Sequence, residues 1–409
     1  MIANYNLSRD IYDICIVGGG ASGIAAAIRA KQLKPDTSLI ILEKNTSLAR
    51  KIRATGNGKC NITNTNASEY GTMSKFLTSI GIITRTYSDG LVYPFSESAK
   101  DVVEMLNFNI SKYGIERLIS STVIDVIKDR SSKFFNIDIL TNCDDGRKIE
   151  NTIYAKNLII STGGKAAPMF GTTGDGYRFA RNFGHRVIKT IPILSGVECY
   201  GEAFRHLQGV RAKGRISLYK HKEMVFYEDG EIQFTKYGIS GIAVFNMTRM
   251  MRLSDGCSFK DFRIVIDLSP GIDMFSVLES KAKYGLTAEG ILTTITKPEI
   301  SRYIIEKSGI KYDKIGLNIE ELKCISNLLH NLTFTPINIR KWSEAQCTSG
   351  GVDLSELDEF YQSRLEKGLF FTGEVVDYDG PCGGYNLTHA FVSGIHAATG
   401  AISNIDEEI

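Results

Sequence analysis

The chain has 409 residues, 43% of them hydrophobic and 23% charged, which is typical of a globular protein with room for two domains. Its formal net charge of +2 gives no reason to expect a nucleic-acid or polyanion surface. The 8 cysteines form no Cys-x-x-Cys pair, which argues against zinc and iron–sulfur motifs. We therefore expect reduced thiols, no metal and a cytoplasmic protein.

Residues 14–28 carry no charge and have the length of a signal-peptide core, but three consecutive glycines make this stretch a poor membrane helix. No other stretch of the sequence approaches the length of a membrane span. We expect no membrane partner, and the oligomeric state stays open.

The first predicted element is a strand over residues 14–17, apolar throughout as in a parallel sheet buried on both faces. Gly18, Gly20 and Gly23 follow as G-x-G-x-x-G and open a helix. The first glycine permits a tight turn, the second lets a pyrophosphate approach the backbone, and the third lets helix pack on strand. This pattern predicts a dinucleotide site at the helix N-terminus.

A second apolar run, residues 39–42, ends in Glu43. An acidic residue about 20 positions beyond the glycines is where a ribose 2′-hydroxyl is held. The alternative is a glycine-rich turn that binds no ligand.

Residues 50–64 match no standard element, because they mix 4 cations with 2 glycines and 3 asparagines. Such a loop offers backbone N–H groups and positive charge to a pyrophosphate or an electron-rich ring. The alternative is a solvated surface loop.

Ser98 and Asp101 form a capping pattern for a helix in which Val102, Leu106 and Ile110 recur at helical spacing. Beyond it, an antiparallel meander is predicted at residues 122–127, 134–140 and 147–155.

The chain returns to the main sheet with a strand at residues 157–160 that runs into the glycine turn 161–164. This turn lies at the carboxyl edge, where α/β sheets bind ligands. A further helix is predicted at residues 177–183.

The pattern changes near Pro192. Alternating strands appear, with a hairpin predicted at Asp229-Gly230, and are followed by helices at 274–282, at 288–295 and from Pro298 onward. We predict an inserted domain over residues 193–342, rich in strands first and helical afterwards, between the two parts 1–192 and 343–409 of the nucleotide-binding domain.

The last predicted strand, within residues 368–374, ends in Gly373-Glu374, and a second bend at residues 380–386 opens a helix over 387–402. Glycine bends after the first, middle and last strands suit an elongated ligand such as FAD. Glu374 can accept from a ribityl hydroxyl, and the helix start can aim N–H groups at the flavin N1/C2 carbonyl edge. A simple helix cap after a turn is the alternative for this last bend.

The motifs together resemble the BaiN/YhiN-type flavoproteins, also described as the aminoacetone-oxidase-like FAD-binding family. The resemblance covers nearly the whole chain and is carried by residues 16–23, 55–64, 161–164, 173–177, 237–241, 350–353, 371–374 and 383–386.

This resemblance implies an α/β fold: a glutathione-reductase-like FAD-binding Rossmann domain interrupted by an inserted β-barrel plus helical domain. It also implies that Lys51, residues 56–61 and residues 383–386 line the flavin and that Val123 lies by the adenine. The sequence departs from the family at Ala49, where glycine is expected, and at Pro381-Cys382, where tyrosine-threonine is expected.

The cofactor-binding candidates lie in the glycine bends, at the strand-end acids and in the basic loop. They are Gly18, Gly20, Ala21, Ser22, Gly23, Glu43, Lys44, Arg50, Lys51, Gly56, Asn57, Gly58, Cys60, Asn61, Val123, Thr162, Gly163, Gly164, Gly373, Glu374, Gly383, Gly384, Tyr385 and Asn386.

We predict an FAD-dependent oxidoreductase that moves a hydride between flavin N5 and a small organic substrate held between the FAD and inserted domains. Because no second G-x-G-x-x-G unit exists, NAD(P)H has to visit the open flavin face, or oxygen is the acceptor. A flavoprotein that modifies tRNA or another RNA, and a non-catalytic flavin-binding or redox-sensing protein, are the alternatives.

No general acid or base is identifiable from the sequence. His389 and His396 lie seven positions apart and share a helix face, and the roles of Cys60, Cys347 and Cys382 stay open.

Overall fold

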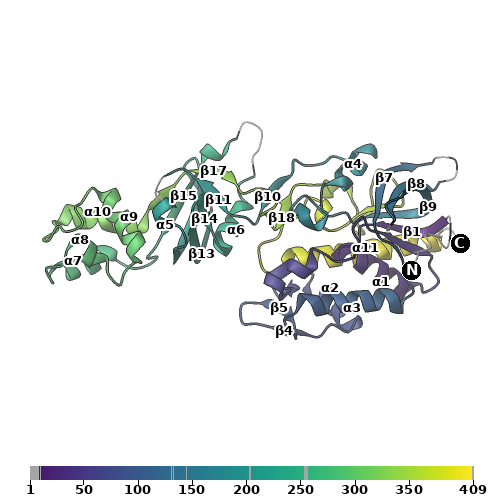
Figure 1. The fold of residues 1–409 in the computed structure, drawn as a ribbon, viewed down its shortest axis with the longest axis horizontal. Coiled ribbons are helices and arrows are strands. Elements are labelled where there is room, and N and C mark those ends of the chain that lie inside the picture. The colour runs from purple at the N-terminus through teal and green to yellow at the C-terminus, as the bar shows by residue number, and fades with distance from the viewer. Residues whose placement is uncertain are drawn as a thin grey trace. The chain divides into compact units, whose positions relative to one another are not determined.

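The computed structural model describes residues 9, 11–129, 131, 133–143, 145–201, 204–252 and 257–407. Backbone contacts divide the chain into two compact units. The nucleotide unit consists of Met1–Ile191 and Cys347–Ile409, and the inserted unit is Pro192–Gln346. Figure 1 shows the elements of both.

The nucleotide unit is built on a seven-stranded sheet with the order β6-β2-β1-β9-β8-β7, in which β19 also pairs with β9. The strands β6, β2, β1, β19 and the second half of β9 are parallel, whereas β7, β8 and the first half of β9 are antiparallel. Their bounds are β1 Ile11–Val17, β2 Leu39–Leu42, β6 Glu116–Leu118, β7 Ser121–Lys128, β8 Phe135–Asn142, β9 Lys148–Ile160 and β19 Leu369–Phe371.

The parallel strands end at one level. Val17 pairs with Leu42 on one side and with Ile160 on the other, and Ile160 pairs in turn with Phe371. The segments that follow these four residues therefore leave the sheet at the same edge. The predicted α/β Rossmann architecture is confirmed, and with it the meeting of these bends at one rim.

Helices cover one face of this sheet, and the β7–β8–β9 meander with α4 covers the other (Figure 1). Alternating side chains of β1 separate the two cores: Ile14 and Ile16 pack among the helices, whereas Cys15 and Val17 pack toward the meander and α4. The helices are α1 Ala21–Leu33, α2 Tyr70–Ser79, α3 Ala99–Lys112, α4 Asp175–Asn182 and α11 Tyr385–Glu407.

The predicted helix after Ser98 is confirmed as α3, and its capping pattern is present. The Asp101 backbone N–H donates to the Ser98 Oγ at 3.2 Å, and Val102, Leu106 and Ile110 are buried.

The long strand β9 corrects one prediction. Residues 147–155 and 157–160 were expected to be separate strands, but Lys148–Ile160 is continuous. Its first half pairs with β8 up to Ala155, and its second half pairs with β1 and β19. In the half-exposed first half of β9, apolar and polar residues alternate, whereas the buried residues 158–160 at its end are continuously apolar. In the sequence this change of pattern looks like the boundary between two strands.

A small antiparallel sheet in the order β3-β5-β4 lies beside the helices of the nucleotide unit. Its strands are β3 Thr63–Asn64, β4 Thr84–Thr86 and β5 Leu91–Pro94. The basic loop that precedes it contains the 3₁₀ segment η1, Ile52–Gly58, which is kinked at Thr55–Asn57.

The inserted unit holds a second seven-stranded sheet, antiparallel in the order β16-β15-β12-β13-β14-β11-β17. Its end strands β16 and β17 follow each other in the chain with only Thr335 between them. The sheet therefore curls until its edges meet, but no pairing closes it into a barrel among the described strands. The strands are β11 Val197–Cys199, β12 Arg211–Lys220, β13 Glu223–Thr235, β14 Gly238–Ser240, β15 Phe262–Asp267, β16 Leu332–Phe334 and β17 Pro336–Ile339.

The hairpin predicted at Asp229-Gly230 is wrong. These residues lie inside β13, where Asp229 pairs with Arg215 and Gly230 with Gly214 of β12. Asp229 also forms a salt bridge with the Arg215 guanidinium at 2.7 Å. The turn lies instead at His221, which has φ 54° and separates β12 from β13.

Helices follow the strands of the inserted unit, as predicted. α7 Met274–Ala282 has the predicted bounds, α8 is shorter at Ala288–Leu292, and α9 Pro298–Ser308 begins at the predicted proline. A further helix, α10 Ile319–His330, was missed although Asn318 and Glu321 form a capping box at its start. The remaining helices of this unit are α5 Phe204–Leu207 and α6 Ile242–Thr248.

Two short strands, β10 Ile191–Ile193 and β18 Cys347–Ser349, mark the places where the chain passes from one unit to the other. No helix among the described residues combines the length and apolar character needed to span a membrane.

The helices α1 and α11 approach each other at the level of their backbones. A methyl group on Gly394 would lie 2.1 Å from the Ser22 carbonyl oxygen, so only glycine fits there. The buried Ser22 also lies against Gly373, where a Cβ would be 2.6 Å from the Ser22 Oγ.

We expect Gly394→Ala to lower the free energy of unfolding by at least about 2 kcal/mol, because the added methyl forces α1 and α11 apart. Gly71→Ala in α2 is the control: a Cβ there meets no atom within 4 Å, and alanine favours helix by up to about 1 kcal/mol. Urea unfolding followed by circular dichroism checks both. Equal stability of the two variants would contradict the close approach.

Candidate functional site

In the first glycine bend, two glycines are required by packing and one lies open. Gly18 has φ +107°, and a Cβ on it would lie 2.4 Å from the Ser161 carbonyl oxygen. A Cβ on Gly23 would lie 2.0 Å from the Gly18 oxygen. A Cβ on Gly20 meets nothing within 4 Å, so this position opens onto free space at the start of α1. Packing thus requires two of the glycines, and the third leaves a cradle that a side chain would fill.

Glu43 is buried at the end of β2, where it holds the glycine bend. Its Oε2 accepts the Gly19 N–H at 2.9 Å, and its Oε1 accepts the Asn45 backbone and side-chain N–H groups at 2.8 and 2.6 Å. A carboxylate has acceptor capacity beyond these bonds. The predicted contact with a ribose hydroxyl stays a prediction.

The two cations near Glu43 are held by neighbouring loops. Lys44 donates to Asp175 Oδ2 at 2.6 Å and to Thr173 Oγ1 at 2.8 Å. Arg50 donates to Asn45 Oδ1 at 2.5 Å. Asn45, which the sequence analysis missed, therefore joins the acid of this corner to one of its cations.

A second network surrounds Glu374, just beyond β19. The Lys51 ammonium donates to Glu374 Oε2 at 2.6 Å, and the Thr348 backbone N–H donates to Glu374 Oε1 at 2.9 Å. The Thr348 Oγ1 accepts the Lys165 and Ala166 backbone N–H groups at 2.8 and 3.0 Å. The structure thus brings together the predicted residues Lys51 and Glu374, which are 323 positions apart.

Thr348 was not among the predicted residues. It is fully buried, and the space that it shares with Glu374 exists because residue 164 is glycine: a Cβ there would lie 2.3 Å from the Thr348 Oγ1. The sequence signal that could have found it is the polar run Cys347–Ser349 directly before a glycine pair.

The remaining predicted residues of this bend are Thr162 and Gly163. The Thr162 Oγ1 is buried without a hydrogen-bond partner, and Gly163 has φ +74°. Both lie directly beyond β9, at the edge shared with Gly18 and Glu43.

The predicted flavin loop has a backbone that few side chains tolerate. Gly56, Asn57, Gly58 and Cys60 all have positive φ, between 54° and 86°. The Cys60 N–H donates to the Thr55 carbonyl at 3.0 Å and closes the loop. Burial raises the pKa of the Cys60 thiol to about 11, so this cysteine is no thiolate at neutral pH.

The C-terminal bend stands against β3 at the start of α11. A Cβ on Gly384 would lie 2.5 Å from the Thr63 carbonyl group, and the Asn64 Nδ2 donates to the Gly383 carbonyl at 3.1 Å. The Asn386 amide holds the preceding turn, accepting from Gly380 N at 2.8 Å and donating to Gly380 O at 2.9 Å. This side chain, predicted to line the flavin, is therefore committed to the turn.

The hydrogen-bonding groups near Asn61 show whether a flavin fits this bend. Its Oδ1 is buried without a hydrogen-bond partner and lies 2.7 Å from the position of a Cβ on Gly384. The first N–H groups of α11, from Tyr385 onward, have no intrahelical acceptor. An acceptor without a partner, beside donors that have no acceptor within their helix, complements the N3–H and C2 carbonyl of a flavin pyrimidine ring. These residues fit the group.

Val123 lies on β7, 7% exposed, in the core that also contains Leu42 and Tyr177. Its predicted position by the adenine stays a prediction. Ala49, at the family's glycine position, has φ 57°, so the loop keeps a left-handed turn that glycine would adopt without strain.

His389 and His396 do share a helix face, because both contact the ring of Tyr361. His389 stacks on Tyr378 with ring centroids 3.9 Å apart, and its Nε2 has no hydrogen-bond partner. Burial lowers the pKa of His389 to about 4.

The buried His185 and Ser363 form a row with the partly exposed Glu356. The His185 Nδ1 is 2.9 Å from Glu356 Oε2, and its Nε2 is 2.7 Å from Ser363 Oγ. The Ser363 oxygen already accepts the Leu365 and Glu366 N–H groups, so its proton points to Nε2 and the imidazole is neutral. The three residues resemble the catalytic triad of a hydrolase. The Ser363 hydroxyl is buried, however, and all its hydrogen bonds are made within the protein, so the row stabilises the fold.

Cys347 is buried, and burial raises its pKa well above the usual value of a thiol. All eight cysteines are free thiols in the structure. The described residues include no group of three or more histidine, cysteine, aspartate or glutamate side chains arranged to hold a metal.

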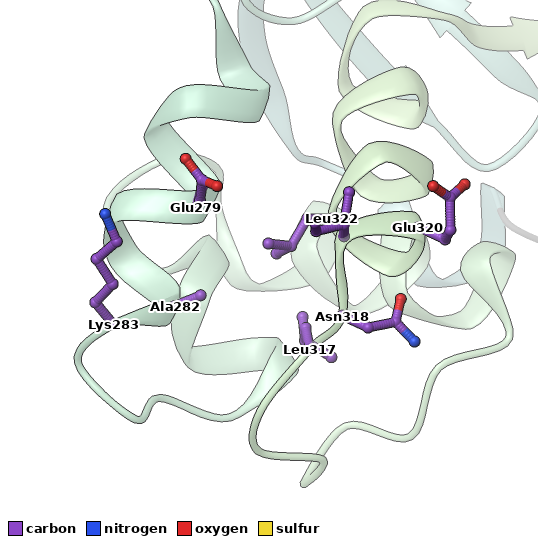
Figure 2. A pocket seen from close by; sticks show the side chains of 8 residues that line it. Glu279, Ala282, Lys283, Leu317, Asn318, Glu320 and Leu322 are labelled. Carbon is purple, nitrogen blue, oxygen red and sulfur yellow. The ribbon is translucent and has the colours of Figure 1, made fainter.

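A pocket of about 600 Å³ lies elsewhere, in the inserted unit between α7 and the start of α10 (Figure 2). Its lining residues are Glu279, Ala282, Lys283, Leu317, Asn318, Ile319, Glu320 and Leu322. Asn318 caps α10, and none of the predicted site residues lines this pocket.

A parallel sheet with a phosphate cradle, two strand-end acids and a helix start against an asparagine defines the class: an FAD-binding oxidoreductase of the Rossmann type. The family described as "HI0933-like protein Rossmann domain" matches residues 69–400. The chain belongs to this family, which confirms the resemblance found in its motifs.

Two relatives match along almost their whole length. The 3-dehydro-bile acid delta(4,6)-reductase of Clostridium scindens is 30% identical over 95% of this chain and 98% of its own. The ribosomal RNA dihydrouridine synthase of Haemophilus influenzae is 28% identical over 92% and 95%. Among solved structures, the 3-ketosteroid-delta4-(5alpha)-dehydrogenase of Rhodococcus jostii RHA1 has a TM-score of 0.48 and 12% identity, covering 98% of both chains.

Gly20→Ala should weaken FAD binding at least tenfold, because the methyl group occupies the cradle that Gly20 leaves open. The apoprotein should lose at most about 1 kcal/mol of stability, since Gly20 is an N-cap with φ −84° and its Cβ meets no atom. Titration of the apoprotein with FAD, read by flavin fluorescence, measures the affinity. Gly71→Ala should leave it unchanged, and tight binding by the Gly20 variant would contradict the assignment.

His389 should make the protein acid-sensitive. Its folded-state pKa of about 4 lies below the ordinary 6.5, so the unfolded chain binds the extra proton first. The part of the free energy of unfolding that depends on a neutral His389 is fully present above pH 6.5. It is lost as pH falls toward 4, and the total loss is on the order of 3 kcal/mol. His389→Gln should flatten the stability–pH curve in this window. His206→Gln, at an exposed residue, should not; equal slopes would refute the role of burial.

Proposed function

We propose that the protein is an FAD-dependent reductase that saturates a carbon–carbon double bond conjugated to a carbonyl group in a small organic molecule, with NAD(P)H as the electron donor. The observation that carries this proposal is the bond change shared by three relatives that match along more than nine-tenths of this chain. One is named a delta(4,6)-reductase of a 3-dehydro bile acid, and two are named ribosomal RNA dihydrouridine synthases. A dihydrouridine differs from uridine by saturation of the ring double bond next to a carbonyl group.

FAD, when bound, supplies hydride transfer at its N5 atom. The chain's own residues supply position and charge. Glu43 and Glu374 lie at strand ends with their carboxylates fixed by backbone N–H groups, which suits them to ribose and ribityl hydroxyls. Lys51 places a positive charge next to Glu374.

The start of α11 supports the carbonyl edge of the flavin. Its first N–H groups, which have no acceptor within the helix, and its positive dipole end would favour negative charge at this edge, and Asn61 would offer the acceptor beside them. A ring held there is more easily reduced than in water.

The second candidate is the same chemistry on a uracil ring in RNA. It is favoured by the ribosomal RNA dihydrouridine synthases of Haemophilus influenzae and Escherichia coli, which are 28% and 25% identical to this chain. The formal net charge of +2 is small for a protein that must hold an RNA backbone. We therefore rank the small-molecule substrate first.

The purified protein should be yellow, with an absorbance band near 450 nm that bleaches on anaerobic addition of NADPH or NADH. A conjugated enone steroid should then restore the band and be recovered with its double bond saturated. Recovery of the band with a uridine-containing ribosomal RNA fragment but with no enone would favour the second candidate. A colourless protein, or one whose flavin no nicotinamide reduces, would contradict the proposal and leave a flavin-binding or sensing role.

A further inference from the structure

One face of the β4–β5 hairpin is built of alternating aromatic, aliphatic and cationic side chains. Arg85 lies opposite Tyr93 in the strand register. The Phe95 N–H donates to the Ile83 carbonyl at 2.8 Å, and the Tyr87 N–H donates to the Leu91 carbonyl at 2.9 Å. Because side chains alternate along a strand, these three cross-strand pairs share one face. We call Ile83, Arg85, Tyr87, Leu91, Tyr93 and Phe95 the hairpin face.

The hairpin face is directed to solvent, since Val92 on the opposite side is fully buried in the helical core. Phe95 is 58% exposed and Tyr87 is 37% exposed. The Arg85 guanidinium lies 4.2 Å from the centre of the Phe95 ring, and Tyr87 meets Tyr93 edge to face at 5.6 Å. Flat rings and a stacked guanidinium thus cover this face.

One end of the hairpin face adjoins the candidate flavin site. A Cβ on Gly56 would lie 3.8 Å from the Tyr93 ring, and a Cβ on Gly383 would lie 3.0 Å from the Leu91 side chain. Both glycines belong to bends predicted to line the flavin. A ligand on the hairpin face can therefore extend into that site.

The charges beside these rings favour an anion. Arg53 on the basic loop and Arg85 are both exposed, and neither forms an ion pair with any residue that the structure describes. Lys59 is paired with Glu97 at 3.0 Å, and Glu97 also accepts the Tyr87 hydroxyl. A guanidinium stacked on an exposed ring suits a planar base that carries phosphate, which is a nucleotide.

We propose that the hairpin face binds the adenosine 2′-phosphate end of NADPH, the electron donor of the proposed function, on which this inference rests. The adenine stacks on the Arg85–Phe95 pair, and Arg85 and Arg53 receive the 2′-phosphate. NADPH gives up a hydride, two electrons with one proton, and leaves as NADP⁺. The sequence has one dinucleotide fingerprint only, so the donor needs a separate surface of this kind.

The size and edges of the hairpin face favour this occupant over an RNA strand. Three cross-strand pairs span about 14 Å, enough for one base and its phosphates. Glu97 accepts the Tyr87 hydroxyl and Asp89 lies in the hairpin turn, so both carboxylates stand at the turn end of the hairpin face, where a continuing polyanion would meet negative charge. A nucleotide of defined length avoids this repulsion.

The test is the affinity of the FAD-loaded protein for NADP⁺ and NAD⁺, measured by calorimetry on wild type, Arg85→Ala and Phe95→Ala. Wild type should bind NADP⁺ more tightly than NAD⁺. Arg85→Ala should raise the Kd for NADP⁺ at least tenfold and bring the two affinities together. Phe95→Ala should weaken both nucleotides at least fivefold, because the base loses its support.

Phe108→Ala is the matched control, because Phe108 is 59% exposed on α3 and lies outside the hairpin face. It should bind NADP⁺ as wild type does. Unchanged NADP⁺ binding in Arg85→Ala and Phe95→Ala, or no NADP⁺ binding by wild type, overturns the inference. Binding of a short single-stranded RNA that Arg85→Ala abolishes, without any binding of NADP⁺, overturns it in favour of RNA.

The same samples separate this inference from the proposed function. Absorbance at 450 nm reports their FAD content independently of the nicotinamide nucleotide. Protein that takes up no FAD refutes the proposed function. Protein that holds FAD, is bleached by NADPH and binds NADP⁺ equally well in all variants refutes only the role of the hairpin face.

Discussion

The backbone contact between α1 and α11 is the constraint on which the site depends. At Ser22 and Gly394 the two helices touch without side chains between them, so neither can slide or rotate. One helix begins at the bend predicted to hold the pyrophosphate, and the other begins at the bend predicted to hold the flavin. From the contact to the start of α11 is about 14 Å along the helix axis. This backbone contact therefore sets the distance between the two bends from which the helices begin.

The two acids of the site repeat one arrangement. Glu43 follows β2 and takes a backbone N–H from the bend after β1, whereas Glu374 follows β19 and takes one from β18. Each carboxylate thus joins two loops before any ligand arrives, and each has a basic or amide side chain on its second oxygen. Preorganised acceptors of this kind save the ordering cost that a flexible acid would add to binding.

Much of this arrangement could be read from the sequence, because it depends on local pattern. The apolar runs of β1 and β2, the G-x-G-x-x-G bend and the Ser98 cap each occupy a few adjacent residues whose spacing carries the information. The errors occur where pattern and context disagree. Asp229-Gly230 has the chemistry of a hairpin turn, but Arg215 across the ladder holds it inside a strand.

The partners within the site were harder to predict, because no local rule joins residues far apart in the chain. Thr348 meets Glu374 across 26 positions, and Asn61 comes to lie beside Gly384 only in the folded chain. The hairpin face has the same origin: its rings are ordinary strand residues until the register places Arg85 among them. Pattern identifies the class of site, and topology decides which side chains complete it.

The unbroken course of β9 has a mechanical consequence. The strand begins in the half-exposed meander and ends at Ile160, two residues before Thr162, so one continuous backbone runs from the meander to the edge of the candidate site. From residue 154 onward the strand is hydrogen-bonded to β1 as well as to β8 or β19, which makes its second half the stiffer one. A displacement of the meander would therefore reach the floor of the site through a backbone without a hinge.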